Sequence, residues 1–458
     1  MVADETARVV AAAAVVVLYL ALCGATFFSQ RRKRGSRAGD LAALASAGDD
    51  TRPLLIAFAS QTGTAQGLAW QTARSLRASG LASRVVAMSE LVADDLRQAQ
   101  SALFLVSTYG EGDPPDNGAL FARRLMSDPL PLPELSYGLL ALGDRAYANF
   151  RGFGLALERW LDSQGAKALF ERVDVDNADE AALRVWNERL GGMGASDLPL
   201  GQMAPVFEEW QLVSRCLLNP GSAGGPTFHV ELAVPTSSRA TAWQAGDLLQ
   251  VLAPGDPTRP RDYSISSLPV DGTVHLLVRQ ERRADGTVGA ASGLLTRDAE
   301  PGSLVQARLR PHPHFHLGDN AARPLILIGN GTGLAGLRVL MKAREASGVR
   351  RTWLVYGERN RETDYYYREE IERWRASGVL ERVDLVFSRD QPERRYVQHR
   401  LTEAAGPIRE WIRKGAAVYV CGSLQGMAAG VDEALESILT RAELDELMAQ
   451  GRYRRDVY

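Results

Sequence analysis

The sequence predicts a multidomain α/β protein in which a doubly wound parallel sheet, a small antiparallel β-barrel and a second doubly wound sheet follow one N-terminal transmembrane helix. Three observations predict this order. Apolar runs alternate with helical stretches as far as residue 190, short strands separated by turns come next, and buried strands alternating with helices return from residue 324. A chain of 458 residues is long enough for roughly three such domains.

The composition is that of an ordinary globular protein, with 45% hydrophobic and 24% charged residues. A net charge of −2 gives no general reason to expect nucleic acid as a partner. The three cysteines, Cys23, Cys216 and Cys421, are too few and too scattered for a disulfide framework and fit a reducing compartment. They form no CxxC pair, so we expect neither a cysteine zinc site nor a redox disulfide.

The N-terminal segment, residues 1–51, is predicted to be a membrane anchor and a tether. Residues 9–28 are apolar and uncharged, and a helix of about 20 residues spans the ~30 Å hydrocarbon core of a bilayer. The basic run RRKRGSR at 31–37 follows this stretch, which predicts a single-pass protein with its catalytic domains in the cytoplasm. A buried helix of a soluble domain is the alternative. A cleaved signal peptide would carry its positive charge before the apolar run.

The first globular domain, residues 52–190, begins with an apolar strand at 54–58 that leads into a loop of small residues and then a helix. Ser60, Thr62, Gly63 and Thr64 bring hydroxyls and backbone N–H groups to a helix N-terminus, a combination that binds phosphate. Helix capping by Ser or Thr would explain the same residues.

Two further loops of this domain are expected at the same edge of its sheet. Strands are predicted at 84–88, 102–107, 139–142 and 169–175, and ligands bind at the carboxyl ends of such strands. The loops STYGEGDPPDN at 107–117 and LGDRAYANFRGFG at 142–154 supply Tyr109 and Tyr147, which could sandwich a flat heterocycle or be ordinary loop aromatics. Asp113 and Asp116 make this rim acidic.

Together these loops resemble the FMN domain of the diflavin reductase family, which includes the sulfite reductase flavoprotein. SQTGTA resembles the family's phosphate loop, and STYGEGDPPDN matches one of its FMN loops throughout. The resemblance implies a flavodoxin-like domain that binds FMN. The residues that it assigns to FMN are Ser60, Gln61, Thr62, Gly63, Thr64, Ala65, Ser107, Thr108, Tyr109, Gly110, Gly112, Leu142, Gly143, Asp144, Tyr147 and Phe150.

A linker at 191–204 and a barrel domain at 205–320 are predicted next. Strands are expected at 206–219, 227–234, 247–253, 273–280 and 303–309. Within this domain RDYSISSLP places Arg261 two residues before Tyr263, on one face of a strand, where the guanidinium could bind a phosphate or form a surface ion pair. GAASGLLT, from residue 289, opens a short helix that could add to a diphosphate site.

These two motifs are similar to the FAD-binding barrel of ferredoxin–NADP reductase-like proteins. The similarity implies that FAD is a second cofactor and that Ser264 lies near the reactive edge of the flavin. The residues that it assigns to FAD are Arg261, Tyr263, Ser264, Gly289, Ala291 and Ser292.

The last domain, residues 321–458, is predicted to bind NADPH. The segment SRDQPERRYVQ groups Ser388, Arg389, Arg394 and Tyr396 at the end of a strand, which suits an extra phosphate and a stacked adenine, although a solvated basic loop is the alternative. The family resemblance adds Gly331, Thr332 and Gln398 to this site.

The glycine-rich loop of this domain departs from its relatives. It reads GNGTGLAG, with Asn330 and Gly336 where the family commonly has proline, and we expect these changes to loosen it.

The resemblance also implies a hydride-transfer cluster. Its members are Ser264, Cys421, Asp456 and Tyr458. The chain ends in GRYRRDVY, and in this family a terminal aromatic ring covers the FAD where the nicotinamide must enter, so Tyr458 is expected to act as a gate. The segment HPHFH places His312, His314 and His316 at alternate positions, but Pro313 disfavours a regular strand, and we expect no metal site.

The expected function is that of an NADPH-dependent diflavin reductase. Electrons would pass from NADPH to FAD, then to FMN, and then singly to a haem or iron–sulfur protein docked near Asp113 and Asp116. The alternatives are a membrane-anchored ferric or free-acceptor reductase and, from another class, a non-catalytic flavin-binding scaffold. Between Gly194 and Arg261 the chain is too short for the family's helical insertion. We therefore expect the FMN domain to swing on its linker.

Overall fold

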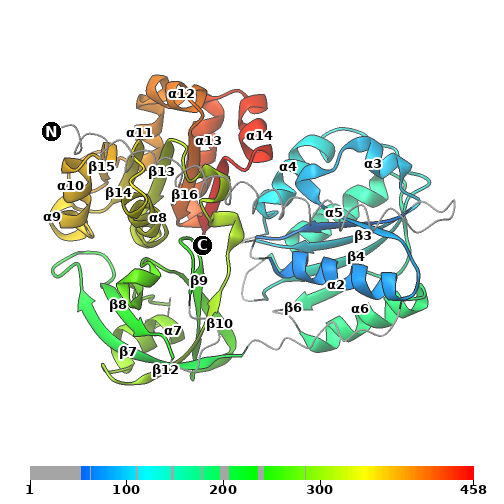
Figure 1. Cartoon of the computed structure of the whole chain (residues 1–458), viewed down its shortest axis with the longest axis horizontal. Helices are drawn as coiled ribbons and strands as arrows, with labels where there is room; N and C mark the ends of the chain where they lie inside the picture. The colour runs from blue at the N-terminus through cyan, green and yellow to red at the C-terminus, as the bar shows by residue number, and fades with distance from the viewer. Residues whose placement is uncertain are drawn as a thin grey trace, which may run out of the picture.

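The computed structural model describes residues 53–458, except 62, 110–111, 146–148, 177–178, 196–205, 236–241 and 284 and the side chains of 258, 424 and 425. The predicted anchor at 9–28 lies outside the described residues. Among the residues that are described, no helix is long and apolar enough to cross a membrane. The chain forms three lobes, and its C-terminus lies where they meet (Figure 1).

The first lobe is a parallel sheet covered by helices on both faces. Its strands are β1 (Leu54–Ala59), β2 (Ser83–Ala87), β3 (Ser101–Ser107), β4 (Ser136–Gly143), β5 (Lys167–Ala168) and β6 (Val173–Asp176), in the order β2-β1-β3-β4-β5 with β6 also paired to β4. Its helices are α2 (Thr64–Ala78), α3 (Ala93–Gln98), α4 (Asp116–Leu125), α5 (Gly152–Ser163) and α6 (Glu180–Gly192). The strands read as continuous apolar runs because both of their faces are buried. The order reverses between β1 and β3, which is where such sheets bind ligands.

Two boundaries in this lobe differ from the predictions. The single strand expected at 169–175 is wrong, because the chain leaves the sheet between β5 and β6, where the ring of Phe170 packs edge-on against Trp186 with centroids 5.6 Å apart. The linker expected from residue 191 begins later, because α6 continues to Gly192 and Leu190 anchors its last turn in the core.

The second lobe is an antiparallel six-stranded barrel. Its strands are β7 (Glu208–Leu217), β8 (Thr227–Ala233), β9 (Leu248–Ala253), β10 (Asp256–Ser264), β11 (Thr273–Arg279) and β12 (Leu304–Arg310), in the order β10-β9-β12-β7-β8-β11. A bridge between Ile265 and Leu276 joins the two ends of this order. The short helix α7 (Ala290–Gly293) precedes a π-helical turn whose Leu295 is buried in the core with Trp210.

The third lobe is a second parallel sheet between helices. Its strands are β13 (Leu325–Asn330), β14 (Thr352–Glu358), β15 (Leu380–Phe387), β16 (Ala417–Gly422) and β17 (Tyr453–Val457), in the order β15-β14-β13-β16-β17. Its helices are α8 (Leu334–Ala346), α9 (Arg361–Asp364), α10 (Arg368–Ala376), α11 (Val397–Glu403), α12 (Ala405–Arg413), α13 (Ala429–Ile438) and α14 (Arg441–Ala449). The strand order reverses between β13 and β16, so the glycine-rich loop and Cys421 meet at the ligand-binding edge.

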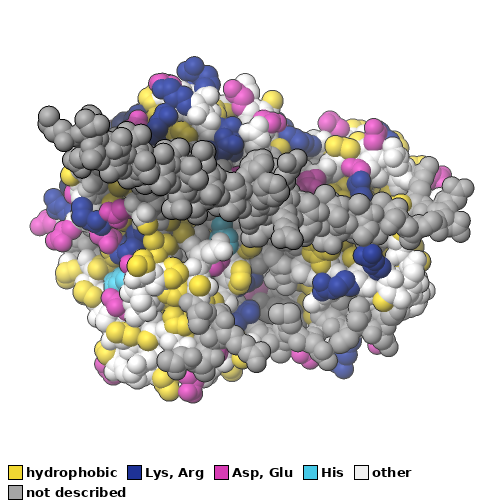
Figure 2. All heavy atoms as spheres, in the orientation of Figure 1, with side chains coloured by type: hydrophobic (Ala, Val, Ile, Leu, Met, Phe, Trp, Pro, Cys, Tyr) yellow, Lys and Arg dark blue, Asp and Glu magenta, His cyan; other side chains and the backbone are white. Residues whose placement is uncertain are grey.

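Charged side chains of both signs are mixed on the face of the molecule that Figure 2 shows. On the face shown in Figure 2, Lys and Arg lie beside Asp and Glu on both the upper and the right-hand lobes. This mixture accords with the small net charge of the chain.

Candidate active site

Three of the four predicted catalytic residues form one buried cluster. The hydroxyl of Ser264, at the end of β10, donates to Oδ2 of Asp456 at 2.7 Å, and Sγ of Cys421 lies 3.5 Å from the same oxygen. Cys421 and Asp456 are opposite each other in the paired strands β16 and β17. The cluster therefore joins the barrel lobe to the third lobe through a single carboxylate.

The electrostatics of this cluster favour orientation over proton transfer. Burial raises the pKa of the Cys421 thiol well above its ordinary value, and the charge of Asp456 raises it further, so the sulfur stays protonated at neutral pH. The cluster thus holds one carboxylate and two neutral donors, and none of the three is a strong base. A hydride acceptor site needs this kind of fixed, water-excluding environment, since hydride transfer requires alignment more than acid–base catalysis.

The glycine-rich loop packs directly against the strand that carries Cys421. A Cβ on Gly333 would lie 2.0 Å from the carbonyl oxygen of Cys421, and one on Gly329 would lie 2.6 Å from it. A Cβ on Gly336 would approach the Cys421 sulfur at 3.0 Å. Glycine is therefore required here for close backbone approach.

Asn330 and Gly336 both lie close to β16, and the expectation that they loosen the loop stays a prediction. Oδ1 of Asn330 accepts from the backbone N–H of Ser423 at 3.0 Å, which ties the loop to the residue after β16. A Cβ at Gly336 would lie 3.0 Å from the Cys421 sulfur, so glycine allows the first turn of α8 to approach β16 closely. Asn330 and Gly336, which stand where the family commonly has proline, therefore both contact β16 or the residue that follows it.

Tyr458 reaches from the end of β17 over the glycine-rich loop. Its backbone N–H donates to the carbonyl of Gly422 at 3.0 Å, and its hydroxyl lies 3.3 Å from Oγ1 of Thr332. The side chain is 52% exposed. The backbone of Tyr458, the predicted gate residue, is thus bound to Gly422. Its side chain is held by one long hydrogen bond from the hydroxyl and is half exposed to solvent.

The FMN loops present buried polar atoms that lack partners among the described residues. These atoms are Oγ of Ser60, Oγ1 of Thr108 and Nδ2 of Asn117. Buried polar groups are normally hydrogen-bonded, so donors of this kind fit a ligand with phosphate, ribityl and ring oxygens. The sequence reasoning did not include Asn117 in the site, although it closes the loop at 107–117; its Oδ1 accepts from the N–H of Ser60 at 2.9 Å.

The two loops at 107–117 and 142–154 also pack on each other. Gly112 has φ +119°, and a Cβ there would lie 2.8 Å from Cβ of Asn149, while one on Gly152 would lie 2.8 Å from the backbone of Gly112. Strands β3 and β4 end at this edge with the predicted residues Ser107, Leu142 and Gly143. Helix α2 begins there with Thr64 and Ala65, preceded by Gly63, which has φ +86°.

Three predicted FMN residues, Thr62, Gly110 and Tyr147, lie outside the described residues, so the proposed sandwich of two tyrosines stays a prediction. Asp144 and Phe150 lie in the second loop, where the Phe150 ring contacts Arg145 and Arg151.

Two of the predicted FMN residues also contact the third lobe. The Tyr109 hydroxyl bonds to both backbone groups of Val457 and lies 2.7 Å from its nitrogen. Nε2 of Gln61 donates to the carbonyl of Arg455 at 2.9 Å, and Gln61 also accepts from the N–H of Asp116 at 2.9 Å. The FMN loops therefore lie on β17, the strand that supplies Asp456.

The predicted FAD residues lie on β10 and around α7. The Arg261 side chain is 39% exposed and lies 3.8 Å from Asp256, whereas Tyr263 packs at the barrel core. Gly289 and Ala291 flank the start of α7. The hydroxyl of Ser292 is used within its own loop, where it accepts from the N–H of Glu281 at 3.1 Å.

The predicted NADPH residues gather after β15. Arg389 and Arg394 have no acidic partner among the described residues, so both guanidinium groups are available to a phosphate. Tyr396 is 41% exposed, Ser388 is buried with its N–H bonded to Glu358, and Oε1 of Gln398 is buried without a partner in the described structure. Gly331 lies in the glycine-rich loop with φ +56°.

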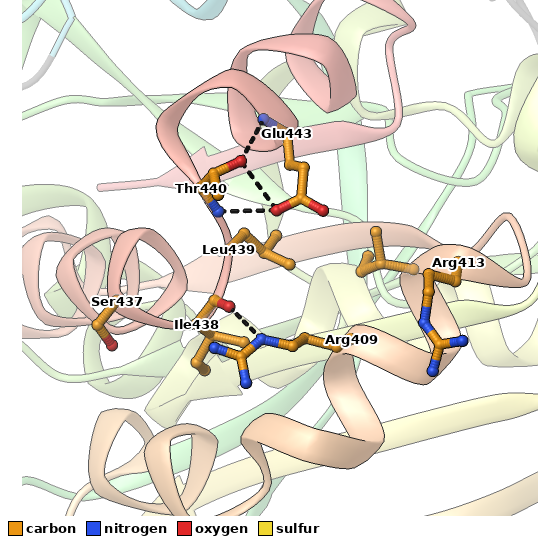
Figure 3. Close-up of a pocket in the computed structure, with 8 residues that line it drawn as sticks. Arg409, Arg413, Ser437, Ile438, Leu439, Thr440 and Glu443 are labelled. Atoms are coloured by element: carbon orange, nitrogen blue, oxygen red, sulfur yellow. Dashed lines mark hydrogen bonds between the residues drawn. The ribbon is translucent and has the colours of Figure 1, made fainter.

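Two other features do not belong to this site. The HPHFH segment forms a 3₁₀ turn at Pro313–Phe315, so its histidines do not alternate along a strand, and His316 instead pairs with Asp247 at 2.6 Å. The pocket in Figure 3 lies beside α12, where Arg409 binds the carbonyl of Ile438 and Thr440 caps α14 with Glu443. No predicted cofactor residue lines that pocket.

A doubly wound lobe, a barrel and a second doubly wound lobe meet near the buried cluster of Ser264, Cys421 and Asp456. This combination defines a class of protein, the flavin- and nicotinamide-dependent oxidoreductases. Comparison with known proteins agrees with that class. A family profile described as flavodoxin matches residues 56–186, and one described as oxidoreductase NAD-binding domain matches residues 327–433.

Similar proteins extend over most of the chain. The sulfite reductase [NADPH] flavoprotein alpha-component of Vibrio cholerae serotype O1 (strain ATCC 39315 / El Tor Inaba N16961) is 28% identical, over 88% of this chain and 87% of its own. The protein of the same name from Bacillus subtilis (strain 168) is 27% identical, over 94% of this chain and 93% of its own. The two domain matches and these relatives support the diflavin reductase family for this chain. It is an NADPH-dependent oxidoreductase whose cofactors are FMN, FAD and NADPH.

Proposed function

We propose that this chain transfers electrons from NADPH, through FAD and FMN, to a separate one-electron acceptor protein that contains haem or an iron–sulfur centre. When bound, NADPH supplies a hydride to FAD, and the flavins convert that electron pair into single-electron transfers. The observation that supports this route is the position of β17. One strand carries Asp456 into the hydride cluster and receives Tyr109 and Gln61 from the FMN loops.

The names of the relatives support a separate acceptor component. Each is called an alpha-component of sulfite reductase, which makes it one part of a larger enzyme. The acidic rim of the FMN lobe gives an acceptor a place to dock, since Asp113 is exposed and Asp116 lies beside it. Asp116 is bound to Arg455 in the described arrangement, so an acceptor that uses Asp116 requires the FMN lobe to leave β17.

The test uses the purified full chain with its flavins. After anaerobic mixing with NADPH, we expect both flavins to be reduced and cytochrome c to be reduced in turn. The rate with cytochrome c should fall as salt rises, because docking on an acidic rim is screened. Asp113→Asn should lower the cytochrome c rate at low salt, while Asp298→Asn, an exposed carboxylate on the barrel, serves as the matched control.

Two outcomes would change this proposal. Protein that retains its flavins but does not consume NADPH would support the non-catalytic flavin-binding scaffold. Cytochrome c reduction that is insensitive to both salt and Asp113→Asn, together with rapid reduction of ferric citrate, would support a free-acceptor reductase.

We propose further that residues 9–28 anchor the protein in a membrane with the catalytic lobes in the cytoplasm. The support comes from the sequence, in which an uncharged apolar stretch precedes the basic run at 31–37. The full chain should sediment with membranes and resist extraction by high salt, and a variant that begins at residue 38 should remain in the supernatant. A full chain found in the supernatant would refute the anchor.

A further inference from the structure

A cluster of two histidines and one glutamate lies on the barrel, apart from the residues assigned to the flavins and NADPH. His229 and Glu231 are at alternate positions of β8 and so share one face of the sheet. His275 lies directly opposite Glu231 on the neighbouring strand β11. One ring nitrogen from each histidine and one carboxylate oxygen of Glu231 all lie within 4.8 Å of one another.

The side chains of this cluster are of the types that transition metals prefer, two imidazoles and one carboxylate, and all three residues are partly buried. Glu231 has no Lys or Arg ion-pair partner among the described residues. Arg338, whose guanidinium lies over the Tyr367 ring, is balanced by two contacts to Glu370 at 2.6 and 2.7 Å.

The hydrogen bonds within the protein do not satisfy this cluster fully. Nε2 of His275 lies 3.0 Å from the hydroxyl of Thr273, but its Nδ1 is buried and has no partner in the described structure. A buried nitrogen without a partner is unfavourable unless a ligand occupies the space. This orphaned atom is an observation independent of the grouping itself.

A tyrosine from the third lobe supports the cluster from outside. Nδ1 of His229 lies 2.9 Å from the hydroxyl of Tyr367, which leaves Nε2 directed to Glu231 at 3.2 Å. Metal-binding histidines characteristically use their second nitrogen in such a bond, which fixes the orientation of the ring. Tyr367 has φ +51°, a left-handed conformation that is costly for a tyrosine and that surrounding contacts must maintain.

We propose that His229, Glu231 and His275 bind a divalent transition-metal ion. Two imidazoles and one carboxylate match the ligand preferences of Zn²⁺, and a water molecule completes a four-coordinate site. Since Tyr367 belongs to the third lobe, the ion fastens the outer face of the barrel to the NADPH-binding lobe. The role is structural, and the site takes no part in hydride transfer.

The experiment measures metal content in the full chain with its flavins, prepared without a polyhistidine tag. The protein is treated with a chelator, incubated with Zn²⁺ alone, passed through gel filtration and examined by elemental mass spectrometry. We expect one bound Zn²⁺ per chain and a higher unfolding temperature with the metal. His275→Gln and Glu231→Gln should each lose the ion, and Tyr367→Phe should bind it roughly 10- to 100-fold more weakly.

Histidines outside the cluster provide matched controls. His399→Gln, in α11, and His314→Gln, in the 3₁₀ turn, should retain the ion. Flavin content and circular dichroism establish that each variant is folded. Wild-type protein that retains no Zn²⁺, or a folded His275→Gln protein that binds it as tightly as wild type, would overturn the proposal. Loss of the ion in His314→Gln would also overturn it, by moving the site to the HPHFH segment.

Discussion

Asp456 is the residue on which the hydride cluster depends. It accepts from Ser264 of the barrel and lies beside the thiol of Cys421, and it is 5% exposed. A carboxylate in this position can stabilise the positive charge of an oxidised nicotinamide ring. Its two neighbours remain neutral, so the charge of the site is that of Asp456 alone.

Replacing Asp456 by Asn should slow hydride transfer while the flavins stay bound. The amide keeps the size of the side chain but removes the charge, and we expect flavin reduction by NADPH to fall roughly 10- to 100-fold, about 1.4–2.7 kcal/mol in activation free energy. Stopped-flow absorbance of the flavins measures this rate. Asp298→Asn is the control, and an unchanged rate in Asp456→Asn would exclude a role for the charge.

Deleting Tyr458 should alter nucleotide selectivity. The ring is half exposed, and its one side-chain hydrogen bond among the described residues, to Thr332, is 3.3 Å long, so the ring can leave its position at a small cost in free energy. We expect the deletion to change the rate of flavin reduction and to raise the efficiency with NADH relative to NADPH. Tyr458→Phe keeps the ring and should resemble wild type. If the deletion leaves both selectivity and rate unchanged, the terminal ring is not a gate.

At the scale of elements, the glycine-rich loop and β16 act as one unit. The loop approaches Cys421 so closely that side chains are excluded at Gly329 and Gly333, and Asn330 bonds to the residue after β16. This arrangement places the nucleotide-binding loop and the hydride cluster in fixed register. Changes in the loop should therefore affect both stability and nucleotide binding.

Gly333→Ala tests this unit. The new Cβ would lie 2.0 Å from the Cys421 carbonyl oxygen, so the backbone must shift, and overpacking of this kind costs about 1–3 kcal/mol. We expect a lower unfolding temperature and weaker NADPH binding, measured by thermal unfolding and by titration calorimetry. Gly406→Ala, in α12 with no neighbour within 4 Å of its Cβ, should change neither. If Gly333→Ala binds NADPH as tightly as wild type, the close packing of the glycine-rich loop on β16 is not needed for nucleotide binding.

At the scale of the whole molecule, the first lobe is docked on the third. Asp116 pairs with Arg455 at 2.9 Å, and on α4 Arg123 pairs with Asp445 at 2.9 Å and with Glu436 at 2.5 Å. These ion pairs accompany the contacts of the FMN loops with β17. The short linker and this docked surface together suggest that the lobe is positioned by side-chain pairs rather than by an inserted domain.

Charge reversal of Arg123 should weaken docking without touching either flavin site. In Arg123→Glu the new carboxylate faces Asp445 and Glu436. Like charges placed together in this way make docking of the two lobes less favourable by several kcal/mol. We expect electron transfer from FAD to FMN to slow roughly tenfold or more, while reduction of FAD by NADPH is unchanged. Arg124→Glu, an exposed neighbour on the same helix, is the control.

A second variant makes this prediction specific. Adding Asp445→Lys to Arg123→Glu should restore part of the transfer rate by re-forming the pair with reversed charges. Transfer at the wild-type rate in Arg123→Glu would show that the docked arrangement does not limit it. In that case the linker prediction would have to be tested separately by stiffening Gly191–Gly194.

The sequence alone predicted the flavodoxin-like lobe, the nicotinamide-binding module and the cofactors, because each depends on contiguous signals. SQTGTA, STYGEGDPPDN and the loop around Gly331 each place their chemistry at the end of one strand, within a few residues of one another. The alternation of strands and helices predicted the two doubly wound parallel sheets, whereas their strand orders are given by the structure. The ends of strands and helices were predicted less well where tertiary contacts determine them. Phe170 packs on Trp186 between β5 and β6, where one continuous strand was expected, and Leu190 keeps the last turn of α6 in the core, beyond the expected end of that helix.

Only the tertiary structure decided which residues meet across lobes. Nothing local to Tyr109 or Gln61 indicates that they bind β17, nothing local to Asn330 indicates its bond to Ser423, and the metal-type cluster joins His229 to a strand more than forty residues away. These contacts depend on chain pairing and lobe docking, which bring together side chains that are distant in sequence. The sequence specifies the chemistry of each loop, whereas the packed lobes determine which loops act together.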